Sequence, residues 1–175
     1  MRFLLLLISL IVSPDSFLYW EDMTEKQQQE VLKSSHVAKI VKEYVASPWE
    51  VSDDEKSFSL LTELTSDCKD PNISALYFFQ FNSILTKADG ALGEVMPDHV
   101  MLLVDRKPEY IFKYLQSHKE LYDRYVFELA CYFYFNGDAS IKDCEVQMKR
   151  RCPKSMTSWI SSFYADVLLR KESID

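Results

Sequence analysis

The sequence predicts an all-α protein, on the evidence of three features. Helix-start signals recur along the chain, apolar residues follow a 3.6-residue period between them, and only three of the 175 residues are glycine. Three glycines are too few for the tight turns of a β-sandwich or barrel, and for the phosphate loops of Rossmann and P-loop folds. We therefore expect about seven helices, arranged as an antiparallel helical bundle or as an α-α superhelical array similar to helical-repeat proteins.

The first helices are marked by a capping spacing, in which Ser or Thr is followed three residues later by Glu or Gln. Thr24 and Gln27 predict a helix that runs to about residue 45, with a break at Ser34-Ser35. Ser52 and Glu55 repeat the spacing, so a second helix is expected to start there.

The middle of the chain predicts a central helix followed by an ambiguous segment. Asp70-Pro71 combines a capping residue with a first-turn proline, and Asp89-Gly90 is expected to end the helix. This helix is apolar on nearly all sides, which is typical of a central position. Segment 91–104 fits a buried strand or a helix by periodicity; we expect a helix, because a lone strand would lack a hydrogen-bonding partner.

The richest aromatic surface is predicted between Pro108 and Gly137. Pro108 suits the first position of one helix, and the Ser117 and Glu120 spacing predicts the start of the next. Asn136-Gly137 is expected to end that helix with a left-handed residue. One stripe of the second helix should face the core: Tyr122, Val126, Leu129 and Phe133, widened by Tyr125 and Tyr132.

Two further helices are predicted at the C-terminal end. Ser140 and Asp143 mimic a capping box, and the helix that they open should end before Pro153. The last helix repeats the spacing of the aromatic stripe with Met156, Ile160, Phe163 and Val167. These four residues are expected to face the core.

Residues 1–16 have the pattern of a signal peptide. Arg2 precedes a predominantly apolar run of ten residues, 3–12, which is shorter than the about 20 residues that a helix needs to cross a bilayer. Cleavage is expected after Ser13 or Ser16, although Pro14 disfavours both positions, so an uncleaved N-terminal anchor remains the alternative. We therefore expect an exported protein, periplasmic or secreted, in which residues 17–175 form a single all-helical domain.

Four cysteines behind an export signal permit disulfides, in three possible connectivities. Cys144 and Cys152 are separated by about 12 Å along one straight helix, whereas a disulfide needs Cα atoms within ~7 Å. The turn at residues 136–137 favours a Cys131–Cys144 bond, which leaves Cys68 and Cys152 as the second pair. The alternative is four buried thiols.

No residue pattern predicts a catalytic, cofactor or metal site. His36, His99 and His118 occur singly, without an HExxH motif or a neighbouring cysteine, and no GxSxG or CxxC motif is present. The acidic groups at residues 53–55 and 67–70 are interpreted as helix starts. The basic run 149–151 is interpreted as cations that complement the C-terminal dipole of a helix.

Two classes of function follow from these observations. The net charge of −7 argues against a nucleic-acid partner, because phosphate binding depends on Lys and Arg. We expect a protein-binding or structural module without catalytic activity, which binds another protein through part of its 24 aromatic side chains (11 Phe, 10 Tyr and 3 Trp). One concrete form would be an inhibitor- or immunity-like protein with an acidic face against a basic partner.

The alternative class is an extracytoplasmic hydrolase whose His, carboxylate and Ser or Cys meet only in the fold. A third hypothesis, a membrane-tethered scaffold, applies if residues 1–16 are retained. No other membrane contact and no cofactor are expected, and the sequence does not indicate an oligomeric state.

Overall fold

The computed structural model describes residues 17–137 and 140–174, so the predicted signal peptide, residues 1–16, lies outside the described part. The described residues form nine α-helices and two short 3-10 helices, and they contain no strand, which confirms the all-α prediction. The helices are α1 (Glu25–Lys33), α2 (Lys39–Ala46), α3 (Glu55–Leu64), α4 (Pro71–Leu85), α5 (Gly90–Arg106), α6 (Pro108–Leu115), α7 (Lys119–Phe135), α8 (Ile141–Arg151) and α9 (Thr157–Glu172); the 3-10 helices are η1 (Trp20–Asp22) and η2 (Lys154–Met156).

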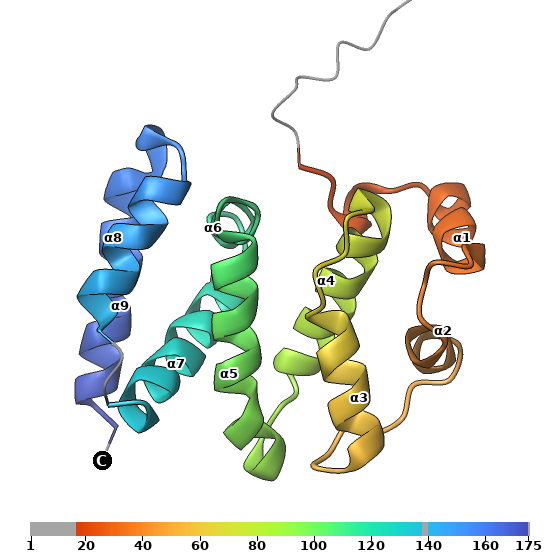
Figure 1. Cartoon of the computed structure of the whole chain (residues 1–175), viewed down its shortest axis with the longest axis horizontal. Helices are drawn as coiled ribbons and strands as arrows, with labels where there is room; N and C mark the ends of the chain where they lie inside the picture. The colour runs from red at the N-terminus through yellow and green to blue at the C-terminus, as the bar shows by residue number, and fades with distance from the viewer. Residues whose placement is uncertain (1–16, 138–139, 175) are drawn as a thin grey trace, which may run out of the picture.

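The helices stand side by side along the long axis of the molecule (Figure 1). Helices α1 and α2 form one end, α3, α4, α5 and α7 follow, and α8 and α9 form the other end. Successive long helices run in alternating directions, and the short helix α6 lies across the top of α5 and α7. The arrangement is that of an α-α array, in which each layer packs mainly on its neighbours.

Aromatic side chains join α6, α7 and α9. Phe163 is fully buried in α9, and its ring centroid lies 5.3 Å from that of Phe112 in α6 and 5.4 Å from that of Tyr122 in α7. The predicted α9 stripe is buried throughout, at Met156, Ile160, Phe163 and Val167. On α7 the predicted face is buried at Tyr125, Val126, Leu129 and Phe133, whereas Tyr122 and Tyr132 are half-buried at its edge.

Four of the predicted helix starts are confirmed, among them Pro108 at the first position of α6. Thr24 and Gln27 form a complete capping box at the start of α1. The Asp70 carboxylate accepts hydrogen bonds from the first backbone amides of α4, and the Ser140 hydroxyl accepts one from the Asp143 amide of α8. The break at residues 34–35 and the helix over residues 91–104 are also confirmed, the latter within α5.

Two predicted caps are wrong, because the serine hydroxyl binds another group in each case. The cap of α3 is Asp54, whose carboxylate accepts a hydrogen bond from the Ser57 amide, and Ser52 instead donates its hydroxyl proton to Asp54. Helix α7 starts at Lys119 without a side-chain cap, since the Ser117 hydroxyl donates to the carbonyl of Tyr114.

Two predicted helix ends also differ. The chain leaves α7 at Asn136 with φ −101° and ψ 65°, and Gly137 does not have the positive φ that was expected. Helix α4 ends at Leu85, so Asp89-Gly90 begins α5 instead of ending α4. Gly90 is the residue with positive φ, 48°, a conformation that glycine adopts without the Cβ clash of other residues.

The capping assignments lead to a first prediction. Thr24→Ala should lower the free energy of unfolding by about 1 kcal/mol, because it removes an acceptor from the start of α1. Ser117→Ala, the control, should change it by less than about 0.5 kcal/mol, because this serine caps no helix. Urea unfolding followed by circular dichroism measures both values, and equal losses would contradict the assignment.

Candidate functional site

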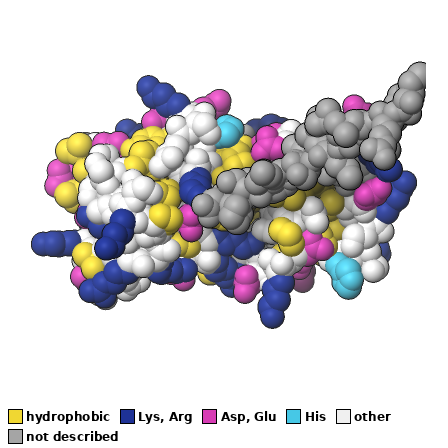
Figure 2. Space-filling model, turned by 90° about the horizontal axis from the view of Figure 1, so that it is seen from above, with side chains coloured by type: hydrophobic (Ala, Val, Ile, Leu, Met, Phe, Trp, Pro, Cys, Tyr) yellow, Lys and Arg dark blue, Asp and Glu magenta, His cyan; other side chains and the backbone are white. Residues whose placement is uncertain are grey.

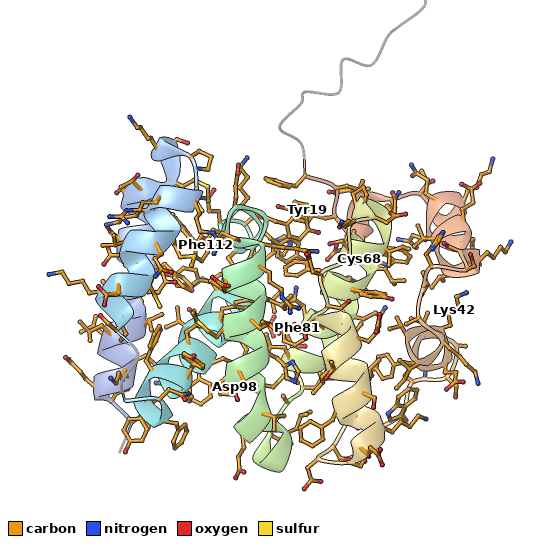
Figure 3. The ribbon with its side chains drawn as sticks, in the orientation of Figure 1. Tyr19, Lys42, Cys68, Phe81, Asp98 and Phe112 are labelled. Carbon is orange, nitrogen blue, oxygen red and sulfur yellow. The ribbon has the colours of Figure 1, made fainter. Side chains whose placement is uncertain are left out.

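A cleft of about 430 Å³ opens on the face where α4 and α6 begin and α5 and α8 end. In Figure 3 this is the upper face, where the labels of Tyr19 and Cys68 lie. Its lining combines an apolar wall with charged side chains. The apolar members are Phe17, Leu18, Pro71, Pro108 and Tyr110, and the charged members are Arg106, Lys107, Glu109 and Arg151.

The three cations of the cleft come from different parts of the fold. Arg106 ends α5 and donates to the carbonyl of Thr65, so it is held against the end of α3. Lys107, in the α5–α6 connection, donates to the Ser74 hydroxyl of α4 at 2.5 Å. Arg151 ends α8 and pairs with Asp105 across 2.7 Å.

The positive charge in the cleft is only partly neutralised. Among the described residues, neither Arg106 nor Lys107 forms an ion pair, and Glu109 is paired with Lys113 at 3.0 Å. Burial lowers the pKa of Lys107, the direction expected for an ammonium group that is short of solvation. Asp67 offsets part of this cost, and a bound anion would add to that compensation.

The start of α6 adds to this preference. Helix α6 has no side-chain cap, and its first-turn residues Pro108, Glu109 and Tyr110 line the cleft. The first amides of a helix lack intrahelical partners and form the positive end of its dipole. Oxygen atoms of an anionic ligand are favoured at such a position.

The apolar wall is built by the segment that precedes η1. The Tyr19 hydroxyl donates to the carbonyl of Tyr110 at 3.2 Å, and the Tyr110 hydroxyl donates to the carbonyl of Leu18 at 3.1 Å. The Phe17 ring packs edge-on against Tyr110 at 5.5 Å, under the Lys113 ammonium at 4.7 Å. Burial raises the pKa of Tyr19 to about 12, so its hydroxyl remains a donor at neutral pH. Phe17 and Leu18 thus line the cleft, and the hydrogen bonds of Tyr19 and Leu18 tie this segment to Tyr110 of α6.

All four cysteines are free thiols, so neither predicted disulfide is present in the structure. Cys131 lies on α7, where its charged neighbours are Glu128, Arg170 and Arg124. Cys144 lies on α8 beside Asp105 and Asp143. The turn between the two helices therefore directs the two thiols towards different surroundings, although their distances from the turn in sequence are similar.

The second expected pair is separated in the same way. Cys68 lies in the cleft, in the connection between α3 and α4, and its thiol contacts the carbonyl of Asp70 at 3.6 Å. Cys152 is buried at the end of α8, where burial raises the pKa of its thiol to about 11. A raised thiol pKa is typical of a packed, unreactive cysteine.

The three histidines do not assemble a catalytic constellation among the described residues. The Nδ1 atom of His99 lies 3.2 Å from the buried Thr65 hydroxyl, and burial lowers the pKa of this histidine. His118 stacks on Tyr114 and contacts the Ser117 hydroxyl at 3.1 Å. Neither histidine has a carboxylate within hydrogen-bonding distance in this part of the chain, so nothing there holds a histidine as a general base.

Within residues 17–137 and 140–174, no group of three or more His, Cys, Asp or Glu side chains is placed to hold a metal ion. None of the helices over those residues is both long enough and apolar enough to cross a bilayer.

Sequence reasoning found the basic run 149–151 but not the cleft. The run does occupy the last turn of α8, as expected, and Lys149 pairs there with Glu145. Figure 2 views the face that carries the cleft from above, and it shows Lys and Arg side chains at the α8–α9 end of the molecule. Of the three residues in the basic run, Arg151 lines the cleft, together with Arg106 and Lys107. The two cations before Pro108, Arg106 and Lys107, are visible in the sequence as a basic pair. Only folding brings Arg151 close to them.

The fold and the cleft together define an all-helical array protein with a cleft of mixed cationic and apolar lining. No family model, no curated protein and no solved structure matches the chain.

Proposed function

We propose that the protein is an exported binding module that holds an acidic segment of a partner protein in the cleft at the starts of α4 and α6. The observation that carries the proposal is the convergence of Arg106, Lys107 and Arg151 on one apolar-walled cleft in a chain of net charge −7. Export is part of the proposal because residues 1–16 have the pattern of a signal peptide.

The chemistry of the cleft favours a carboxylate next to an apolar side chain. Guanidinium groups bind carboxylates with two parallel hydrogen bonds, and Arg106 and Arg151 each retain donors beyond the one that binds the protein. The apolar wall, with Tyr110 at its centre, can cover an aliphatic or aromatic side chain. A volume of about 430 Å³ is in the range of small binding pockets, so we expect it to take two or three residues of a partner.

This proposal differs from the inhibitor-like form considered above, in which an acidic face met a basic partner. The local charge of the cleft is opposite to the net charge of the chain, so a partner segment of opposite charge is acidic. Exposed aromatic side chains, among them Tyr134 and Phe135 at the end of α7, support a protein-binding role for the wider surface.

A peptide-display selection tests the proposed function. Full-length protein, produced in a secreting host, is used to select from a library of random eight-residue peptides. We expect enrichment of peptides that place Asp or Glu next to Leu, Phe or Tyr. Enrichment of basic peptides, or of no class, would contradict the proposal.

Charge variants then locate the binding. Arg151→Gln should weaken the selected peptides by about ten-fold, because it removes a charged hydrogen-bond donor from the cleft. Arg150→Gln is the matched control, since Arg150 lies in the same last turn of α8, is exposed, and does not line the cleft. Fluorescence anisotropy measures both affinities, and an equal effect of the two variants would place binding elsewhere.

A further inference from the structure

A second groove, of about 380 Å³, lies where the end of α4 meets α7 and α9. It is lined by Arg124 and Phe127 of α7, by Arg170 of α9 and by two acidic residues of α7, Glu120 and Asp123. Glu120, Asp123 and Arg170 are exposed, so that water and salt screen their charges, whereas Arg124 is half-buried. The groove shares no lining residue with the cleft described above.

Arg124 is held by a partner that is buried behind the groove. Its Nη2 atom lies 2.8 Å from Oε1 of Glu128 and donates to the carbonyl of Ala88 at 2.7 Å. Glu128 is fully buried in α7, and neither of its carboxylate oxygens has an aligned hydrogen-bond donor. The Nε atom of Arg124 is also buried without an acceptor. The pair is thus close, but its hydrogen-bonding capacity is largely unused.

Arg170 is held by fewer interactions than Arg124. Its guanidinium lies 5.2 Å above the Phe127 ring, and that of Arg124 lies 5.5 Å from the same ring centre. Arg170 forms no ion pair within the described part of the chain. Both guanidinium groups thus line one groove beside the same aromatic ring, where an anion can accept hydrogen bonds from their free donors.

We propose that this groove is a binding site for a small oxyanion, held by Arg124 and Arg170 over Phe127, and that the bound oxyanion competes with the buried Glu128 for Arg124. The site is independent of the cleft and of the peptide-binding function proposed for it. An oxyanion satisfies guanidinium donors that the protein leaves free, and its presence weakens the attraction between Arg124 and Glu128.

Competition for Arg124 links oxyanion binding to a proton. The charged group that acts on Glu128 is Arg124, and the titratable neighbour is the Cys131 thiol, both on its own helix; Arg170 of α9 lies near Cys131. Burial raises the pKa of Glu128 to about 7, so the carboxyl changes its charge near neutrality. A bound anion raises this pKa further, and by linkage a neutral Glu128 strengthens anion binding. Binding should therefore be tighter below pH 7 than above it.

Sulfate is a suitable probe, because its charge is constant over the pH range of interest. Calorimetric titration of the full chain with sulfate should show binding that is about five- to ten-fold tighter at pH 6 than at pH 8.5. Arg170→Gln should weaken binding at least about five-fold at both pH values. Arg150→Gln, an exposed charge at the end of α8, is the matched control and should leave the affinity unchanged.

Glu128→Gln tests whether the pH dependence of sulfate binding arises from the proton on Glu128. In this variant the pH 6 affinity should persist at pH 8.5, whereas a pH dependence equal to that of the wild type would overturn the linkage. If Arg124→Gln and Arg170→Gln both bind sulfate as the wild type does, the site itself is refuted. Titrations with acetate and with inorganic phosphate at pH 6 distinguish a carboxylate from a phosphate as the preferred oxyanion.

Discussion

Replacing Glu128 with Gln is expected to raise the free energy of unfolding at pH 8 by about 3 kcal/mol, and to leave it nearly unchanged at pH 4. Glu128 is fully buried, and the nearby Arg124 compensates only part of the cost of burying its charge. Burial raises the pKa of this carboxyl from 4.5 to about 7. Gln has nearly the same shape and no charge to bury.

The direction of this pH dependence follows from the number of protons that the folded and unfolded states bind. Between pH 4.5 and pH 7 the folded protein keeps the Glu128 proton, whereas the unfolded chain releases it. Stability in the wild type therefore falls as the pH rises through this range, by about 1.4 kcal/mol for each pKa unit of the shift. Below pH 4.5 both states are protonated, and the difference between wild type and variant disappears.

Urea unfolding at half-unit steps from pH 4 to pH 8 measures the difference between the wild type and Glu128→Gln. Glu120→Gln is the control, because Glu120 is exposed on the same helix and should change the stability by less than about 0.5 kcal/mol throughout. A difference for Glu128→Gln that does not change with pH would show that the pKa of Glu128 is the same in the folded and unfolded states, contrary to the prediction.

Phe163→Ala is expected to lower the free energy of unfolding by about 3 to 5 kcal/mol. Phe163 is fully buried, and its ring is within 5.5 Å of the rings of Phe112, Tyr122, Trp159 and Tyr164. The substitution would open a cavity where α6, α7 and α9 meet, and aromatic neighbours of this size cannot close it without shifting the helices.

Phe135→Ala provides the matched control for the same chemical change. Phe135 ends α7 and is 74% exposed, so its removal should cost less than about 0.5 kcal/mol. Thermal and urea unfolding of the two variants give the comparison. A loss below about 1 kcal/mol for Phe163→Ala would mean that the α6, α7 and α9 layers do not pack on this residue.

Helix positions were predictable where a local interaction determines them. Thr24 and Asp70 cap the helices that their spacing indicated, because the groups that they satisfy lie within three residues. The same rule was wrong for Ser117, whose hydroxyl binds the preceding turn, and for Ser52, which supports Asp54 instead. A capping spacing shows that a cap is possible, whereas backbone geometry and competing acceptors decide whether it forms.

The cleft and the groove could not be predicted in this way. Arg106 and Arg151 are separated by three helices in sequence. Phe17 lies beside them in a segment that is held by two hydrogen bonds, from the Tyr19 hydroxyl to the carbonyl of Tyr110 and from the Tyr110 hydroxyl to the carbonyl of Leu18. The burial of Glu128 could likewise not be predicted, because this residue lies among the aromatic residues of α7 and no local spacing marks it as buried. Sequence spacing shows which face of a helix a residue occupies, but not which other helix covers that face.

The sequence by itself determined the all-α class, most helix positions and the buried stripes of α7 and α9, because periodicity and capping act over a few residues. Tertiary structure alone decided that the helices form an array, that the four cysteines lie apart as free thiols, and that three cations share one cleft. These outcomes depend on contacts between residues far apart in the chain. Their geometry is set by how the helix faces pack on one another, which no local spacing records.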